Sequence, residues 1–237
     1  MKMFRNPFWG KRWIVSLGAV VCALGILAAV RFVHWRAEKR FQDDISVYLR
    51  KYSVLVDEAI DLYLADDITI ARFQNRSVEM ANDALILKRD VASVRTSSKR
   101  AEEIRELFLA SLDEMSNFLE SGNEALSALI YFETSTDIFE MRCSSWIWNK
   151  SERLEAFDDV VSAGERTIEL CHYWKATSDS WRNKHDKLRS LVSGFEEIPS
   201  SRGLKLRDEV LQFADYYDHI DDWRSNMSVL RNALENY

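Results

Sequence analysis

The chain has 237 residues, of which 47% are hydrophobic and 12% aromatic, so it can build a sizeable core and is not a disordered tail. Seven glycines and two prolines are far below the usual combined frequency of about 12%, which predicts long, uninterrupted helices. From Arg36 onward the chain carries 27 basic against 38 acidic residues, a net charge of −11. A body this acidic repels phosphate backbones, which argues against nucleic acid as a partner.

The first strong feature is a run of eighteen uncharged residues over positions 13–30. As a helix it is roughly 27 Å long, close to the hydrocarbon thickness of about 30 Å. We predict a transmembrane anchor over residues 13–35, preceded by a short basic tail over residues 1–12. A cleaved signal peptide and a buried core helix are the alternatives. The best cleavage site, Ala23-Leu24-Gly25, is followed by five more apolar residues, which disfavours cleavage.

Aromatic and basic residues flank this run, as they do at the headgroup level of a bilayer. The predicted membrane interface comprises Trp9, Trp13, Arg31, Trp35, Arg36, Lys39 and Arg40. The basic residues after the run could hold anionic lipid or could simply end the span. The N-terminal side leads by a single positive charge, which favours an N-inside orientation and an extracytoplasmic body, periplasmic if the source is bacterial.

Small residues repeat along the run at spacings of four, three and four. The predicted packing face for another helix consists of Gly18, Cys22, Gly25 and Ala29. Small residues are also common in membrane spans without packing significance, so both interpretations stay open.

A heptad of apolar residues follows and predicts a helical stalk over residues 36–66. Its members are Phe41, Ile45, Leu49, Tyr52, Val56, Ala59 and Tyr63. No glycine or proline lies between Val30 and Asp66, so we expect the anchor to continue into the stalk without a break. Asp66 and Asp67 are a plausible stop and restart.

A helical bundle domain is predicted over residues 67–237. Its first helix should begin near Ile68 and reach about Ser121, either as one helix or as two separated at Thr96-Ser97-Ser98. Gly122 and Asn123 indicate a helix end and a new N-cap. Polar residues at 134–137 and at Asn149 indicate further breaks, so short helices are expected over residues 123–150.

A long helix is then expected from about Leu154 to Val192, ended by Ser193 and Gly194. A loop follows over residues 195–203, and the cleanest heptad of the chain runs from Leu206 to Leu234. No stretch alternates with a period of two, so no sheet is expected. The predicted fold class is all-α: an N-terminal transmembrane helix followed by an extended bundle of long antiparallel helices with coiled-coil-like packing.

Two polar groupings have the residue types of metal sites. Glu169 and His172 share one helical face, but a di-iron site needs a second such pair and two further glutamates. The acids Asp215, Asp218, Asp221 and Asp222, with His219, lie mostly opposite an apolar stripe and fit a solvated face. We therefore predict no metal, no cofactor and no catalytic residues.

Two cysteines and two tryptophans remain as candidate sites. Cys143 and Cys171 could form a disulfide in an oxidising compartment, or they could be ordinary apolar residues. Trp146 and Trp148 stand two apart and do not share a helical face, which makes either a candidate anchor for a partner. Aromatic core packing, together with Trp174 and Trp181, is the alternative.

These features predict a membrane-anchored, non-catalytic protein that acts as an interaction or assembly component of a membrane or envelope complex. Its expected partners are membrane lipid and protein, either other chains or copies of itself. The alternative is an extracytoplasmic sensor that binds a small ligand between its helices, with Trp146, Trp148 or Trp174 lining the pocket, and signals through a partner.

Overall fold

The computed structural model describes residues 8–64, 70–145, 147–202 and 220–236, and side chains for 22–63, 72–145, 147–202 and 220–236. These ranges contain α1 (Phe8–Leu64), α2 (Ile70–Ala92), α3 (Lys99–Ser144), α4 (Lys150–Leu191) and α6 (Ile220–Glu235). No strand occurs in the described ranges, so the predicted all-α fold class is confirmed there.

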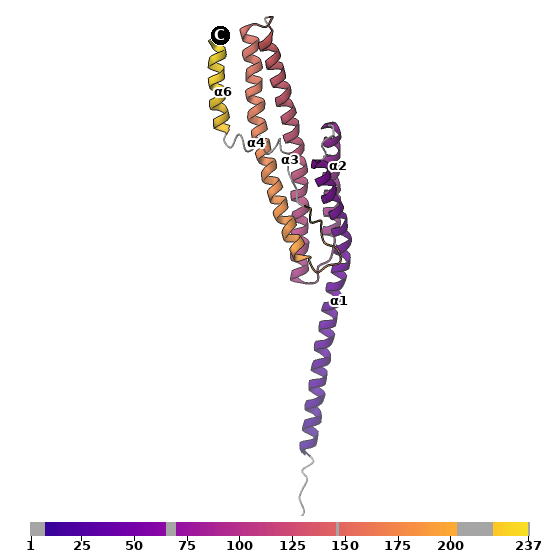
Figure 1. Ribbon diagram of the computed structural model, residues 1–237. Helices are drawn as coiled ribbons and strands as arrows, with labels where there is room; N and C mark the ends of the chain where they lie inside the picture. The colour runs from indigo at the N-terminus through magenta and orange to yellow at the C-terminus, as the bar shows by residue number, and fades with distance from the viewer. Residues whose placement is uncertain (1–7, 65–69, 146, 203–219, 237) are drawn as a thin grey trace, which may run out of the picture.

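Figure 1 shows α1 as a long rod, one half of which lies beside α2, α3 and α4 while the other half extends away alone. The chain runs up α1, down α2, up α3 and down α4. The hairpin of α3 and α4 continues beyond α1 and α2, and α6 lies along α4 toward the hairpin end. The described helices therefore form an elongated antiparallel bundle on a helical stem.

The half of α1 inside the bundle buries the predicted heptad stripe. All seven of its members, from Phe41 to Tyr63, are at most 2% exposed. As the lack of glycine and proline predicts, α1 continues unbroken from the stem into the bundle. The expected stop at Asp66 and Asp67 lies outside the described residues.

The open question at Thr96-Ser97-Ser98 is settled as two helices. Helix α2 ends at Ala92, and Ser98 is the N-cap of α3, where its hydroxyl accepts a hydrogen bond from the amide of Ala101 at 3.1 Å. Val91 and Val94 stay buried across the turn, so the apolar stripe continues although the helix does not.

The predicted helix end at Gly122 is wrong, because α3 runs from Lys99 to Ser144 without interruption. Gly122 is buried in mid-helix. A Cβ at this position would lie 2.5 Å from the Tyr63 hydroxyl and 3.0 Å from the Trp174 ring. The glycine lets α1 and α4 approach α3, so its lack of a side chain serves packing rather than capping.

The predicted short helices over residues 123–150 are also wrong up to Ser144. Polar residues of this stretch bond within the helix: the Thr136 hydroxyl donates to the carbonyl of Phe132 at 2.9 Å, one turn earlier. The break at Asn149 is confirmed. Asn149 and Glu152 form a reciprocal capping box that starts α4.

Helix α4 follows the predicted long helix closely, and it contacts α6 through a second tightly packed glycine. Trp223 of α6 lies against Gly164, is 3% exposed, and donates its indole N–H to the carbonyl of Val161 at 3.2 Å. Arg224 binds Glu165 at 2.7 Å on the same side. The start of the heptad expected over residues 206–234 lies outside the described residues, whereas its end is helical in α6.

Candidate functional site

The stem part of α1 carries large apolar side chains that are exposed on the surface of the molecule. Residues 22–36 are all exposed. The large hydrophobic side chains there are between 48% and 66% exposed: Leu24, Ile26, Leu27, Val30, Phe32, Val33 and Trp35. A helix that is apolar on every side is normally surrounded by protein or by lipid. This segment is therefore the first candidate functional region.

Part of the predicted transmembrane anchor lies outside the described side chains, namely Trp13 and the residues up to Val21, together with the interface residue Trp9 and the packing residue Gly18. Where side chains are described, no helix has a stretch long and apolar enough to cross a membrane.

The described part of the predicted packing face is open. Cys22 and Ala29 are exposed, and a Cβ built on Gly25 would meet no atom within 4 Å. The predicted interface residues Arg31, Trp35, Arg36, Lys39 and Arg40 are exposed at the end of the stem nearest the bundle, and Lys39 Nζ lies 5.8 Å from the centre of the Trp35 ring. Their place at a membrane interface stays a prediction.

The second candidate region is a buried polar network between α1, α3 and α4. The Tyr52 hydroxyl lies 2.6 Å from the Ser111 hydroxyl and 3.1 Å from His185 Nδ1, and it accepts the Trp181 indole N–H at 2.9 Å. Tyr52, Ser111 and His185 are all buried. Since burial disfavours the phenolate, the pKa of Tyr52 is raised to about 12.

The contacts of His185 fix where its protons lie. His185 Nε2 lies 2.9 Å from the carbonyl oxygen of Ser200, which can only accept, so Nε2 carries a proton. In the neutral ring Nδ1 then accepts the Tyr52 O–H, and the Ser111 O–H donates to Tyr52. Burial lowers the pKa of His185, which favours this neutral state. Every polar atom of the network then has a partner.

A strap of chain after α4, residues 197–202, ties this network to the outer side of α1. The Ser200 hydroxyl donates to Asp57 at 2.6 Å, and Arg202 pairs with Asp61 at 2.5 Å. The Arg189 Nε–H donates to the carbonyl of Pro199 at 3.0 Å. The strap therefore holds the end of α4 against the stalk helix.

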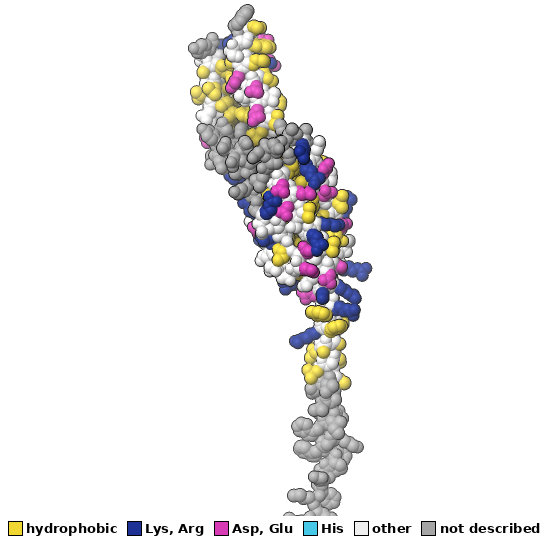
Figure 2. Space-filling model, turned by 45° about the vertical axis from the view of Figure 1, so that its right-hand side comes forward, with side chains coloured by type: hydrophobic (Ala, Val, Ile, Leu, Met, Phe, Trp, Pro, Cys, Tyr) yellow, Lys and Arg dark blue, Asp and Glu magenta, His cyan; other side chains and the backbone are white. Residues whose placement is uncertain are grey.

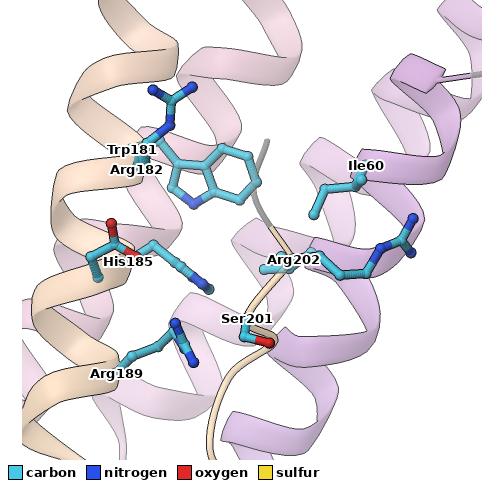
Figure 3. A pocket seen from close by; sticks show the side chains of 9 residues that line it. Ile60, Trp181, Arg182, His185, Arg189, Ser201 and Arg202 are labelled. Carbon is cyan, nitrogen blue, oxygen red and sulfur yellow. The ribbon is translucent and has the colours of Figure 1, made fainter. Parts of the chain in front are cut away.

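A cavity of about 230 Å³ lies between α1, α4 and the strap. Val56, Ile60 and Trp181 form its apolar wall, and His185, Arg189 and Arg202 are among its polar lining residues. Figure 3 shows Trp181 and His185 of α4 across the cavity from Ile60 of α1, with Ser201 and Arg202 of the strap alongside. This volume suits a ligand smaller than most drug-sized molecules.

Trp148 and Trp174, two of the tryptophans proposed for a ligand pocket, do not line this cavity. Trp174 is fully buried in an aromatic cluster, 5.2 Å from the Tyr63 ring centre, and Trp181 stacks on Phe118 at 5.1 Å. The core alternative is thus confirmed for Trp174 and Trp181. Trp148 is half-buried under Arg142, whose guanidinium is 5.2 Å from its ring centre. Trp146 lies outside the described residues, and the partner-anchor role stays a prediction.

The candidate disulfide between Cys143 and Cys171 is not formed, and both thiols are free. Cys143 is exposed near the end of α3, whereas Cys171 is buried in the core on α4. Residue 171 lies 21 positions into α4, roughly 30 Å of helix away from the hairpin turn, far beyond disulfide reach. Burial raises the pKa of the Cys171 thiol to about 12.

Neither predicted polar grouping forms a metal centre within the described ranges. Glu169 is exposed on α4, and no group of three or more His, Cys, Asp or Glu residues is placed to hold an ion. Asp215, Asp218 and His219 fall outside those ranges. Asp221 and Asp222 lie in the first turn of α6.

The sequence interpretation missed the Tyr52–His185 network. Its only visible signal was a histidine at position 185 within an otherwise largely apolar stripe of α4, and nothing in the pattern pointed to the carbonyl of Ser200. Comparison of the chain with protein-family models, with curated proteins and with solved structures gave no match.

Proposed function

We propose that this chain is a single-pass membrane protein whose N-terminal helix anchors a non-catalytic helical bundle beside the bilayer, where the bundle serves as an interaction or assembly component. One observation carries the proposal. The apolar stem over residues 22–35 is exposed on all sides and continues directly into the bundle helix. Burying its seven large side chains in lipid would contribute on the order of 10 kcal/mol.

The remainder of the molecule supports an assembly role through its surfaces. Tyr131, Ile138, Met141 and Ile147 are exposed toward the end of the α3–α4 hairpin farthest from the stem, and Ile147 is 71% exposed. Large exposed apolar side chains of this kind are frequent at sites of protein contact. The bundle would then present its hairpin to other chains, or to copies of itself, at a fixed distance from the membrane.

Two arginines in the stem should abolish anchoring. Leu24→Arg/Leu27→Arg places two charges near the centre of the proposed span, at about 2.5–3.5 kcal/mol each. We expect the parent chain to stay in the membrane pellet after carbonate extraction and the variant to be lost from it. Val47→Arg/Val54→Arg is the control, because both valines are exposed on the bundle part of α1, and it should stay in the pellet.

Crosslinking of the same intact membranes, followed by mass spectrometry, addresses the assembly role. Reproducible neighbours at the α3–α4 hairpin are expected. Release of the parent chain by carbonate, or a mature chain that begins downstream of residue 25, would refute the anchor. Recovery of monomer alone would refute the assembly role.

The cavity favours a second candidate function, a sensor that binds a small ligand beneath Trp181. A ligand there would change the indole environment, so a saturable fluorescence response is expected in a screen of small amphipathic molecules. Ser201→Phe should block the response, because Ser201 lines the cavity. Ser193→Phe, at an exposed position outside the cavity lining, should leave it intact. Absence of any saturable response would eliminate the sensor.

A further inference from the structure

Two basic segments that are distant in the sequence lie at the same end of the bundle. Residues 31–40 contain four basic residues and one acidic residue, and residues 88–100 contain five basic residues and one acidic residue. The first segment is where the apolar stem enters the bundle, and the second covers the turn between α2 and α3. In a chain with a net charge of −6, two such segments stand out.

Contacts between α1 and α2 bring the two segments together. Helix α2 is antiparallel to α1, because Arg76 pairs with Glu58 at 2.5 Å and Asp90 pairs with Lys51 at 3.8 Å. Descending α2 therefore leads back toward the stem, and the turn that follows Ala92 lies at the stem end of the bundle (Figure 1).

The first basic segment lies directly below the stem end of the bundle. Phe41 and Ile45 are 2% and 0% exposed, so the base of the bundle reaches the helical turn directly after Arg40. At 1.5 Å per residue, Arg36 is roughly 8 Å below Phe41 along the axis of α1. The electrostatic screening length at physiological salt is also about 8 Å. Charges on both segments can therefore act on one surface.

The basic side chains at this end have no carboxylate partner among the described residues. The set comprises Arg31, Arg36, Lys39 and Arg40 on α1 and Arg89, Arg95, Lys99 and Arg100 around the turn, and each is exposed. We call it the basic base. Several arginines higher in the molecule are paired, for example Arg224 with Glu165 and Arg231 with Asp158. Figure 2 shows Lys and Arg side chains gathered where the stem meets the bundle.

Most acidic residues near the basic base are farther from the stem than its arginines and lysines, or form ion pairs of their own. Asp43 and Asp44 follow Arg40 by about one turn, on the bundle side. Asp90 pairs with Lys51, and Glu102 pairs with Arg105 at 3.7 Å. Glu38 and Asp90 are the acidic residues of the two segments, so positive charge clearly outnumbers negative charge at the stem end of the bundle.

We propose that the basic base binds the anionic phospholipid headgroups of the leaflet from which the bundle emerges. The inference rests on the proposed membrane anchor, which places Arg31 and Arg36 at the level of the lipid phosphates. An acidic bundle alone would be repelled by an anionic surface. Contact through the basic base overcomes that repulsion and holds the bundle with its α2–α3 turn toward the membrane and its α3–α4 hairpin away from it.

The test uses the full chain in vesicles and measures how close the turn lies to the lipid. Ser97→Cys, in a background with Cys22→Ala and Cys143→Ser, carries a donor fluorophore, and headgroup-labelled lipid is the acceptor. When phosphatidylglycerol replaces part of the phosphatidylcholine, energy transfer should rise at low salt and fall back at high salt. Arg95→Gln/Arg100→Gln should lower the ratio of docked to undocked bundle by about fivefold per removed charge.

A matched control removes the same charge elsewhere. Arg72→Gln/Arg166→Gln alters two exposed arginines away from the base and should behave like the parent. The proposal would be overturned if energy transfer did not change with the phosphatidylglycerol content, or if both double variants lost the same amount of energy transfer, while the chain remained anchored. Failure of the anchor itself would be seen separately, as a chain that carbonate washes off the vesicles.

Discussion

Replacing Gly122 with alanine should destabilise the bundle by about 1–3 kcal/mol, even though alanine is the better helix former. The added Cβ would lie 2.5 Å from the Tyr63 hydroxyl and 3.0 Å from the Trp174 ring. Neither neighbour can retreat, because both side chains are at most 1% exposed and each contacts the Phe118 ring. The substitution therefore forces α1 and α4 away from α3.

Gly194 is the matched control. A Cβ there meets nothing within 4 Å and its φ is not positive, so Gly194→Ala should be neutral or should stabilise by up to about 1 kcal/mol. The free energy of unfolding can be measured by urea titration of the detergent-solubilised chain, followed by circular dichroism. Equal stability of the Gly122 and Gly194 variants would contradict the packing role of Gly122.

The spacing of residues in the sequence correctly predicted those parts of the fold that depend on a local pattern along one helix. The heptad from Phe41 to Tyr63 is buried throughout, and Asn149 caps α4 through Glu152, because both features can be predicted from residue spacing within one helix. Gly122 misled the prediction for the opposite reason. A glycine in a helix can end it or admit a neighbour, and only the positions of Tyr63 and Trp174, distant in the sequence, decide between the two.

For the candidate sites, too, the sequence predicts features that are local to one segment and misses those that need contacts between distant residues. The apolar stem and its basic border are local in the sequence, so they were identified from the sequence alone. The Tyr52–His185 network joins three helices and the strap, and no spacing rule connects residues 52, 111, 185 and 200. Only the α1 half of the basic base was identified from the sequence. The other half was missed because it joins the first only through the antiparallel course of α2, which brings the turn at residues 93–98 back to the stem.

Removing the Tyr52 hydroxyl should weaken the bundle by about 1–3 kcal/mol at neutral pH. Tyr52→Phe keeps the ring but leaves the Trp181 indole N–H and His185 Nδ1 without the hydroxyl that both contact. These groups are buried, so water cannot replace the lost partner easily. Tyr131→Phe is the control, because Tyr131 is 58% exposed and its hydroxyl is solvated, and it should unfold like the parent chain.

The polar network around His185 should make the free energy of unfolding depend on pH in the acid range. The pKa of His185 is lowered by burial, so the folded chain resists protonation that the unfolded chain accepts. The contribution of His185 to the free energy of unfolding is therefore complete above about pH 6.5 and is lost as the pH falls below that value. His185→Gln can still donate to Ser200 and accept from Tyr52, so this variant should show a shallower decline in acid.

On the alkaline side, the Tyr52 pKa of about 12 stands above the ordinary value of 10.0. The folded chain therefore holds the phenol proton more tightly, and the contribution of Tyr52 is complete below pH 10. Between pH 10 and 12 about 3 kcal/mol should be lost. Other groups titrate in this range, so the decisive quantity is the difference in unfolding free energy between the parent chain and Tyr52→Phe, which should shrink as the pH rises. A difference that stays constant from pH 8 to pH 12 would show that the Tyr52 hydroxyl is not held neutral inside the bundle.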